Sequence, residues 1–111
     1  MDVNGASQND GAQIIQHDCH GGKNQDFAVS FENGQLVLTA QHSNKVVSIE
    51  GAKKVNGANA QQQSNKNSSN QKYIVRPKGG NKYQLVSVNS NKCLDVYGGG
   101  KQNGARIIQV R

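Results

Sequence analysis

The sequence contains no tryptophan, one proline, two cysteines and only 5% aromatic residues. Hydrophobic residues reach 33% and charged residues 18%, a profile that departs both from average globular usage and from strongly charged disorder. No apolar run approaches the roughly 18 residues of a membrane helix, and the opening Met1-Asp2-Val3-Asn4 lacks the basic start and apolar run of a signal peptide. The length of 111 residues predicts a single domain with a small core and no membrane span.

Metal and disulfide chemistry find little support in the sequence. Cys19 and Cys93 are too few for a disulfide framework and do not have metal-ligand spacing. His17, Asp18 and His20 lie near one another along the chain, but a spacing of three on a loop is weak evidence for a metal ion. We predict no metal site and no cofactor.

No catalytic constellation is recognisable either. The carboxylates Asp10, Asp18 and Asp26 are regularly spaced, but each lies in or beside a predicted turn, and no Ser-His-Asp order emerges. The segment Gly98-Gly99-Gly100-Lys101 lacks the Gly-x-x-x-x-Gly-Lys-Ser/Thr pattern of a phosphate loop. We predict that the chain is not an enzyme.

The net charge is +6, from 13 Lys+Arg against 7 Asp+Glu, and in principle it favours an acidic partner. The lysines, however, are spread from Lys23 to Lys101, with only Lys53 and Lys54 adjacent. Dispersed charge is typical of a solvated surface, so we do not expect a nucleic-acid interface. A basic binder of nucleic acid or acidic glycan remains the third and weakest functional hypothesis.

Short apolar segments with a period near two run through the chain and predict strands of about four to six residues. They are Gln35–Leu38, Val46–Ile49, Tyr73–Val75, Tyr83–Val88 and Arg106–Ile108. Clusters such as Asn33-Gly34, Gly79-Gly80 and Asn103-Gly104 separate them and supply the positive φ of tight turns. No window holds the pattern of an amphipathic helix, so the fold class is all-β.

A motif recurs along the chain at a spacing of 46 and 47 residues. Its copies are Met1-Asp2-Val3 with Asp10-Gly11-Ala12, Val47-Ser48-Ile49 with Asn56-Gly57-Ala58, and Leu94-Asp95-Val96 with Asn103-Gly104-Ala105. We divide the single domain, residues 1–111, into repeats of approximately 1–33, 34–81 and 82–111. They hold ten predicted strands, near Val3, Ile15, Ala28, Leu36, Val47, Gln61, Ile74, Leu85, Leu94 and Ile107, where three full units would have about twelve.

The residues Cys93-Leu94-Asp95-Val96, the glycines and Asn-Gly-Ala after them, and the segment His17–Phe27 resemble the ricin B-chain-type lectin family. This resemblance implies a β-trefoil of three repeats. The Gln-x-Trp signature of the family corresponds to Gln25-Asp26-Phe27 and Gln71-Lys72-Tyr73, in which Phe or Tyr replaces Trp. A large ring at that position is expected to fill the centre of the barrel.

The same resemblance indicates that the trefoil is incomplete at both termini. The usual disulfide would pair Cys19 with a cysteine just before Met1, and Cys93 with one just after Arg111, and neither partner is present. A fragment, an engineered truncation or part of an assembly completed by another chain fits this pattern. The missing first and last strands would be neighbours, so we expect one open gap with unpaired edges and, as a hypothesis, self-association across it.

The family pattern assigns a sugar site to the first repeat. It places Asp2 as the carboxylate, His17 at the stacking position, His20 as a polar neighbour and Asn24 as the amide, with Gln25 beside it. A carboxylate accepts hydrogen bonds from adjacent sugar hydroxyls, and a flat ring lies against the C–H face of a sugar. The alternative is that Asp2 caps a local turn and the histidines are ordinary loop residues.

The other two repeats match the pattern less well. In the second, Ser48, Gln63 and Lys66 replace the carboxylate, the ring and the histidine, and only Asn70 is retained, so we expect this site to be inactive. In the third, Asp95 is a weaker candidate, because the stacking position falls at Val110 and the chain stops before the amide. Tyr97 is expected to be a turn residue rather than a substitute ring.

Taken with the resemblance, these residues predict a non-catalytic carbohydrate-binding module that recognises galactose- or xylose-type sugars through a shallow site in the first repeat. Family members often serve as the targeting module of a secreted toxin or glycoside hydrolase, which implies an extracellular location. The alternative is a structural or protein-interaction trefoil, or an engineered fragment, with decayed sugar sites.

Overall fold

The computed structural model describes all residues 1–111 and contains ten strands, five one-turn 3₁₀ helices and no α-helix. All ten predicted strand positions are confirmed. The strands are β1 (Asp2–Val3), β2 (Ile14–Ile15), β3 (Phe27–Glu32), β4 (Gln35–Ala40), β5 (Val46–Ile49), β6 (Ala60–Gln63), β7 (Tyr73–Pro77), β8 (Tyr83–Ser87), β9 (Cys93–Val96) and β10 (Ile107–Val110). The 3₁₀ helices are η1 (Asn4–Ala6), η2 (Lys23–Gln25), η3 (Glu50–Ala52), η4 (Ser69–Gln71) and η5 (Tyr97–Gly99). None is long or apolar enough to cross a membrane.

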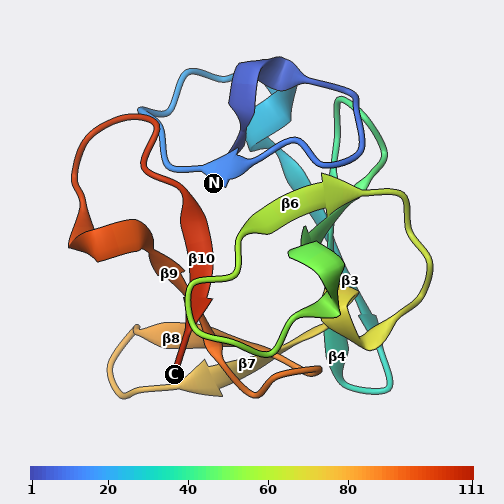
Figure 1. Ribbon diagram of the computed structural model, residues 1–111, viewed down its shortest axis with the longest axis vertical. Coiled ribbons are helices and arrows are strands. Elements are labelled where there is room, and N and C mark those ends of the chain that lie inside the picture. The colour runs from blue at the N-terminus through green and yellow to red at the C-terminus, as the bar shows by residue number, and fades with distance from the viewer.

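Eight strands form one sheet that curls around the core (Figure 1), with the order β10-β9-β8-β7-β4-β5-β6 and β3 paired to β4. All of the strand pairs are antiparallel, and β1 pairs with β2 as a separate ribbon. The Cα extents of 31 × 28 × 27 Å are nearly equal, so the molecule is close to spherical.

Three isolated bridges join the repeats into a ring. They are Gln13 to Gln61, Asn59 to Ile108 and Arg106 to Ile15. Each links an equivalent position of one repeat to an equivalent position of the next, and the last returns from the third repeat to the first. The chain therefore has the threefold arrangement of a β-trefoil.

A glutamine side chain reinforces each junction of this ring. Gln62 Nε2 donates to the carbonyls of Ser7 and Asn9, at 2.7 and 2.9 Å. Gln109 does the same to Lys53 and Val55, and Gln16 to Gly100 and Gln102. Buried polar groups must find such partners, so these glutamines fix the loops of one repeat onto the strands of the next.

The residue at the centre of each motif is followed by the same tight backbone turn. Gly5, Gly51 and Gly98 occupy equivalent places in η1, η3 and η5 with φ of 64°, 58° and 63°. This left-handed conformation strongly favours glycine. It turns the chain immediately after β1, β5 and β9, which holds Asp2, Ser48 and Asp95 at the ends of their strands.

The core is centred on the second repeat. Tyr73 is completely buried among the aliphatic residues of the main cluster, and its hydroxyl donates to the Val47 carbonyl at 3.2 Å. Burial raises the pKa of the Tyr73 phenol well above its usual value. The equivalent ring in the first repeat, Phe27, is only half-buried. The predicted barrel-filling role therefore holds fully for Tyr73 and partly for Phe27.

The third repeat is open where the second is sealed. Leu36 pairs with Tyr73 and is 4% exposed, whereas the equivalent Tyr83 is 62% exposed. A hollow of about 300 Å³ lies here, lined mainly by apolar side chains that include Tyr83, Leu85, Leu94 and Val96. Met1 and Ile107 also line this hollow.

Candidate functional site

A buried carboxylate organises the first repeat. Asp2 lies in β1 and is 2% exposed. Its Oδ1 accepts a hydrogen bond from Asn24 Nδ2 at 3.1 Å, and its Oδ2 accepts one from Gln25 Nε2 at 2.7 Å. Hydrogen bonds to a charged acceptor are about twice as strong as neutral ones, so the two amides hold this carboxylate in one orientation.

The two amides are the side chains of Asn24 and Gln25, which lie in η2. Asn24 also donates to the Val3 carbonyl at 3.0 Å, which uses both of its N–H groups. Gln25 donates to the Asp18 carbonyl at 2.8 Å and accepts from the His20 backbone N–H at 2.9 Å. Gln25 therefore clasps the 18–20 loop, while Asn24 ties η2 to β1 and keeps its Oδ1 free of partners within the chain.

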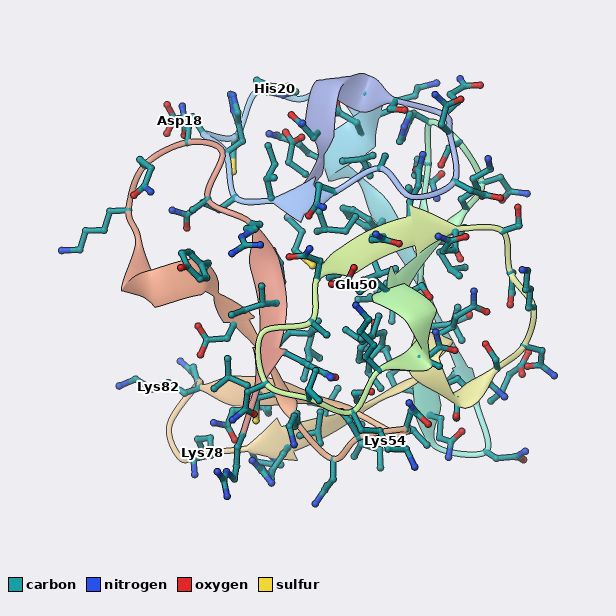
Figure 2. The ribbon with its side chains drawn as sticks, in the orientation of Figure 1. Asp18, His20, Glu50, Lys54, Lys78 and Lys82 are labelled. Carbon is teal, nitrogen blue, oxygen red and sulfur yellow. The ribbon has the colours of Figure 1, made fainter.

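His20 lies against the carboxylate from the solvent side. Figure 2 shows His20 near Asp18 at the periphery of the molecule. Its Nε2 is 3.4 Å from Asp2 Oδ2, and its Nδ1 accepts a hydrogen bond from the Gly22 N–H at 3.0 Å. Because Nδ1 is an acceptor, the ring proton of neutral His20 sits on Nε2 and points to Asp2. His17 is exposed and meets the His20 ring edge-on, with centroids 5.5 Å apart.

The potential metal ligands that lie together here differ from the His17, Asp18 and His20 considered from the sequence. Ligand atoms of Asp2, His17 and His20 all lie within 4.8 Å of one another. Asp18 is not part of this group, because its carboxylate accepts a hydrogen bond from Asn103 instead. With the proton of His20 on Nε2, that atom has no lone pair for an ion. The absence of a metal remains a prediction.

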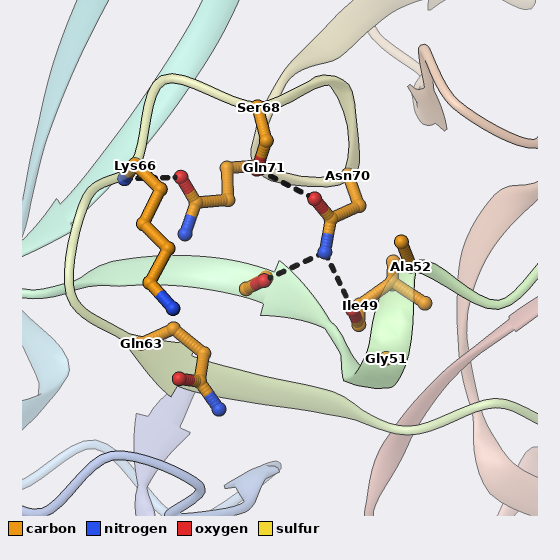
Figure 3. A pocket seen from close by; sticks show the side chains of 9 residues that line it. Ile49, Gly51, Ala52, Gln63, Lys66, Ser68, Asn70 and Gln71 are labelled. Atoms are coloured by element: carbon orange, nitrogen blue, oxygen red, sulfur yellow. Dashed lines mark hydrogen bonds between the residues drawn. The ribbon is translucent and has the colours of Figure 1, made fainter.

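The second repeat contains a similar hydrogen-bonded frame, made of Ser48, Asn70 and Gln71 (Figure 3). Asn70 Nδ2 donates to Ser48 Oγ at 3.2 Å and to the Ile49 carbonyl at 2.8 Å. Gln71 donates to the Ser64 carbonyl and accepts from the Lys66 backbone N–H, each at 2.9 Å. They correspond to the bonds that Asn24 and Gln25 make in the first repeat, with Ser48 in place of the carboxylate, except that the bond of Gln25 to Asp2 has no counterpart.

A polar hollow of about 290 Å³ lies over this second frame. Its lining includes Ser48, Gln63, Lys66 and Asn70, the four positions that correspond to the sugar site of the first repeat. The only other hollow is the apolar one in the third repeat. A polar hollow thus lies over the repeat that the sequence marks as the poorest match, and none lies over Asp2, where His20 lies against the carboxylate.

The third repeat does not assemble a comparable site. Asp95 is exposed, and its side chain makes no hydrogen bond or ion pair within the chain; it borders the apolar hollow. Tyr97 lies in η5, as the turn prediction requires, and its ring faces the Arg106 guanidinium at 4.3 Å. This cation–π contact was not apparent from the sequence, because nothing in the spacing pairs the two residues.

The structure brings Asp2, His20, Asn24 and Gln25 together, and His17 lies beside them. The sequence did not predict that Gln25 and Gln71 each hydrogen-bond a carbonyl and an N–H group of the loop before them. Their separation of 46 residues is the signal that could have revealed it.

Comparison with known proteins agrees with this geometry. Residues 24–110 match the family model described as "Ricin-type beta-trefoil lectin domain-like". No curated protein matches the chain in sequence. Among solved structures, the designed threefold-symmetric protein ThreeFoil is 37% identical, with a TM-score of 0.95 over 98% of this chain and 79% of that one.

Two larger proteins share the fold at lower identity. An exo-beta-1,3-galactanase from Clostridium thermocellum is 23% identical, with a TM-score of 0.92 over 97% of this chain and 24% of that one. A mosquitocidal holotoxin is 15% identical, with a TM-score of 0.85 over 98% of this chain and 14% of that one. The chain thus spans about a quarter or less of these two proteins.

Proposed function

The chain belongs to the ricin-type beta-trefoil lectin domain-like family, and from that premise we propose that it is a non-catalytic carbohydrate-binding module acting through its first repeat. Its architecture is that of a carbohydrate-binding module. Galactose- and xylose-type sugars are the ligands we propose, and an extracellular location is part of the same proposal.

The observation that carries this proposal is the orientation of the Asp2 carboxylate. Asn24 and Gln25 hold it from one side, and two carboxylate oxygens have about four lone-pair sites, so acceptor capacity remains for sugar hydroxyls. The Oδ1 of Asn24 adds a further acceptor. Two adjacent hydroxyl groups of a pyranose present donors at a separation that such a fixed carboxylate can accept together.

His20 and His17 complete the proposed site. The contact of His20 with Asp2 is long, at 3.4 Å, and the His20 side chain is 43% exposed. We propose that the ring swings outward when a sugar hydroxyl takes its place on Asp2. The exposed His17 ring then offers a flat surface to the C–H face of the sugar. Both contacts are modest, so binding in this site is weak and shallow.

The same geometry supports a binding role rather than glycoside hydrolysis. Glycosidases usually need two carboxyl groups on opposite sides of the scissile bond. The proposed site offers one, Asp2, because the side chain of Asp18 is turned to Asn103.

Replacing the carboxylate tests the proposal. Asp2→Asn removes the charge but keeps the shape, and we expect it to weaken binding of galactose or xylose at least about tenfold, because hydrogen bonds to charged groups contribute about 1.5–3 kcal/mol. Affinity chromatography and calorimetry measure the effect. Asp26→Asn is the matched control, since its carboxylate is exposed and makes no side-chain hydrogen bond. Equal affinity in wild type and Asp2→Asn would refute the site.

One observation favours a second candidate function, protein interaction. The apolar hollow of the third repeat exposes Tyr83 and half-exposes Leu85, Leu94 and Val96, and we propose that a second copy of the chain covers it. Light scattering over a concentration series measures this association. A species that stays monomeric, or a dimer that Leu94→Glu leaves intact, would count against it.

A further inference from the structure

The second repeat keeps the frame of the first but reverses its electrostatic character. No carboxylate lines the hollow over Ser48, whereas Asp2 is the central group of the first repeat. The one charged residue in the lining is Lys66, which occupies the position of His20. A ligand that suits one repeat is therefore a poor match for the other.

At the base of the hollow, the side-chain oxygens of Asn70 and Gln71 are engaged, whereas donors of Ser48 and Gln71 are without partners. Both N–H groups of Asn70 are used, and its Oδ1 accepts from Ser68 Oγ at 2.7 Å. In the first repeat the corresponding oxygen of Asn24 is free. The acceptor capacity of the amide is thus already engaged in the second repeat.

Two donors at the base of the hollow remain available. The Ser48 hydroxyl accepts from Asn70 but donates to no group in the chain, although the residue is 2% exposed. Gln71 uses one N–H on the Ser64 carbonyl. Its other N–H is the one that in Gln25 reaches Asp2 Oδ2, and Ser48 is too short to meet it. Buried donors without an acceptor are costly, which favours a ligand oxygen there.

Lys66 supplies a positive charge to the same space. Its ammonium group makes no ion pair within the chain, in contrast to Lys45 and Lys53. Figure 3 shows its side chain reaching from the 64–71 loop toward Gln63 at the rim. Lys66 is exposed, so its ammonium is free to meet an anion that enters the hollow from solvent.

We propose that the hollow of the second repeat binds a sugar that carries a carboxylate, that is, a uronic acid unit. The ligand carboxylate lies between Lys66 and the free donors of Ser48 and Gln71, which reverses the first repeat, where the protein carries the carboxylate. A volume of about 290 Å³ is at the lower end for ligand pockets and suits one saccharide unit. One cation matches a monoanion rather than a phosphate dianion.

This inference rests on the proposed function only in taking the ligand to be a saccharide. The two sites share no residue, so each can fail alone. Neutral sugars test the first repeat, and acidic sugars test the second.

The experiment is an NMR titration of the intact chain with galacturonate, with galactose and with acetate at pH 7. Galacturonate should shift the amide signals of Ser48, Lys66 and Asn70, and acetate should bind far more weakly. Lys66→Met should weaken galacturonate binding at least about threefold at low salt, the scale of an exposed ion pair, and 0.5 M NaCl should weaken it in the wild type.

Matched variants separate the outcomes. Lys66→Arg should retain binding, and Lys78→Met, which removes an equal charge from an exposed loop, should leave it unchanged. Asp2→Asn should leave the galacturonate shifts of the second repeat intact even where it abolishes galactose binding. The inference is overturned if Lys66→Met binds as the wild type does, if galactose moves the same signals equally, or if acetate reproduces them at equal concentration.

Discussion

The first and second repeats present one scaffold with two chemistries. In both, an asparagine bonds the end of a strand and the residue at the centre of the motif, and a glutamine bonds the loop that precedes it. The central residue is Asp2 in one and Ser48 in the other. The comparison teaches that the amides and the glycine turn set the geometry, and we propose that the central residue and its neighbour, His20 or Lys66, set the ligand.

The two repeats also differ in how firmly that scaffold is anchored. Below the second repeat, Tyr73 is fully buried and bonded to Val47, whereas Phe27 below the first is half-buried. The second frame therefore rests on the better packed part of the core.

The largest expected effect comes from removing these rings. Tyr73→Ala should destabilise the fold by about 3–5 kcal/mol, a large share of the 5–15 kcal/mol typical of a domain. Phe27→Ala should cost clearly less, because less of its surface leaves water on folding. Chemical denaturation of both variants measures the difference, and equal losses would show that the two repeats are anchored alike.

Tyr73→Phe is the milder variant if Tyr73→Ala does not fold. Loss of the bond to Val47 should cost about 0.5–1.5 kcal/mol at neutral pH. The folded-state pKa of Tyr73 is raised above 10.0 by burial, so its contribution is full below pH 10 and is lost as pH rises above that value. Part of the alkaline destabilisation of the wild type should therefore be absent in Tyr73→Phe.

A smaller and more specific effect is expected from converting one repeat into the other. Ser48→Asp places a carboxylate next to Asn70 and the free N–H of Gln71. We expect it to weaken galacturonate at least about tenfold, because like charges brought together cost several kcal/mol, and to allow weak binding of galactose. Combining it with Lys66→His should strengthen that galactose binding. NMR titration measures the affinity for both ligands. If the variants prefer galacturonate over galactose as the wild type does, the central residue does not determine the ligand.

Much of the fold could be predicted from the sequence because turn chemistry repeats at a fixed spacing. Gly5, Gly51 and Gly98 adopt nearly the same φ, and each ends a strand at the expected place. Such local requirements are visible in residue types. The grouping of Asp2 with Asn24 and Gln25 was likewise accessible, through the family resemblance.

The parts that could not be predicted depend on side-chain packing. The sequence does not show that His20 fills the space over Asp2, or that a hollow remains beside the longer and more flexible Lys66. It also does not show that Asp18 turns to Asn103, which is why the expected combination of metal-ligand candidates differed from the observed one. These outcomes depend on rotamers and on contacts between distant residues.

The central claim is that the oriented carboxylate of Asp2 binds a neutral sugar. It is tested most directly by an NMR titration of the wild-type chain with galactose and xylose, with Asp2→Asn beside it. We predict that at least one sugar shifts the signals of His17, His20 and Asn24 in the wild type and not in Asp2→Asn. Absence of these shifts with either sugar, or their persistence in Asp2→Asn, would contradict the account.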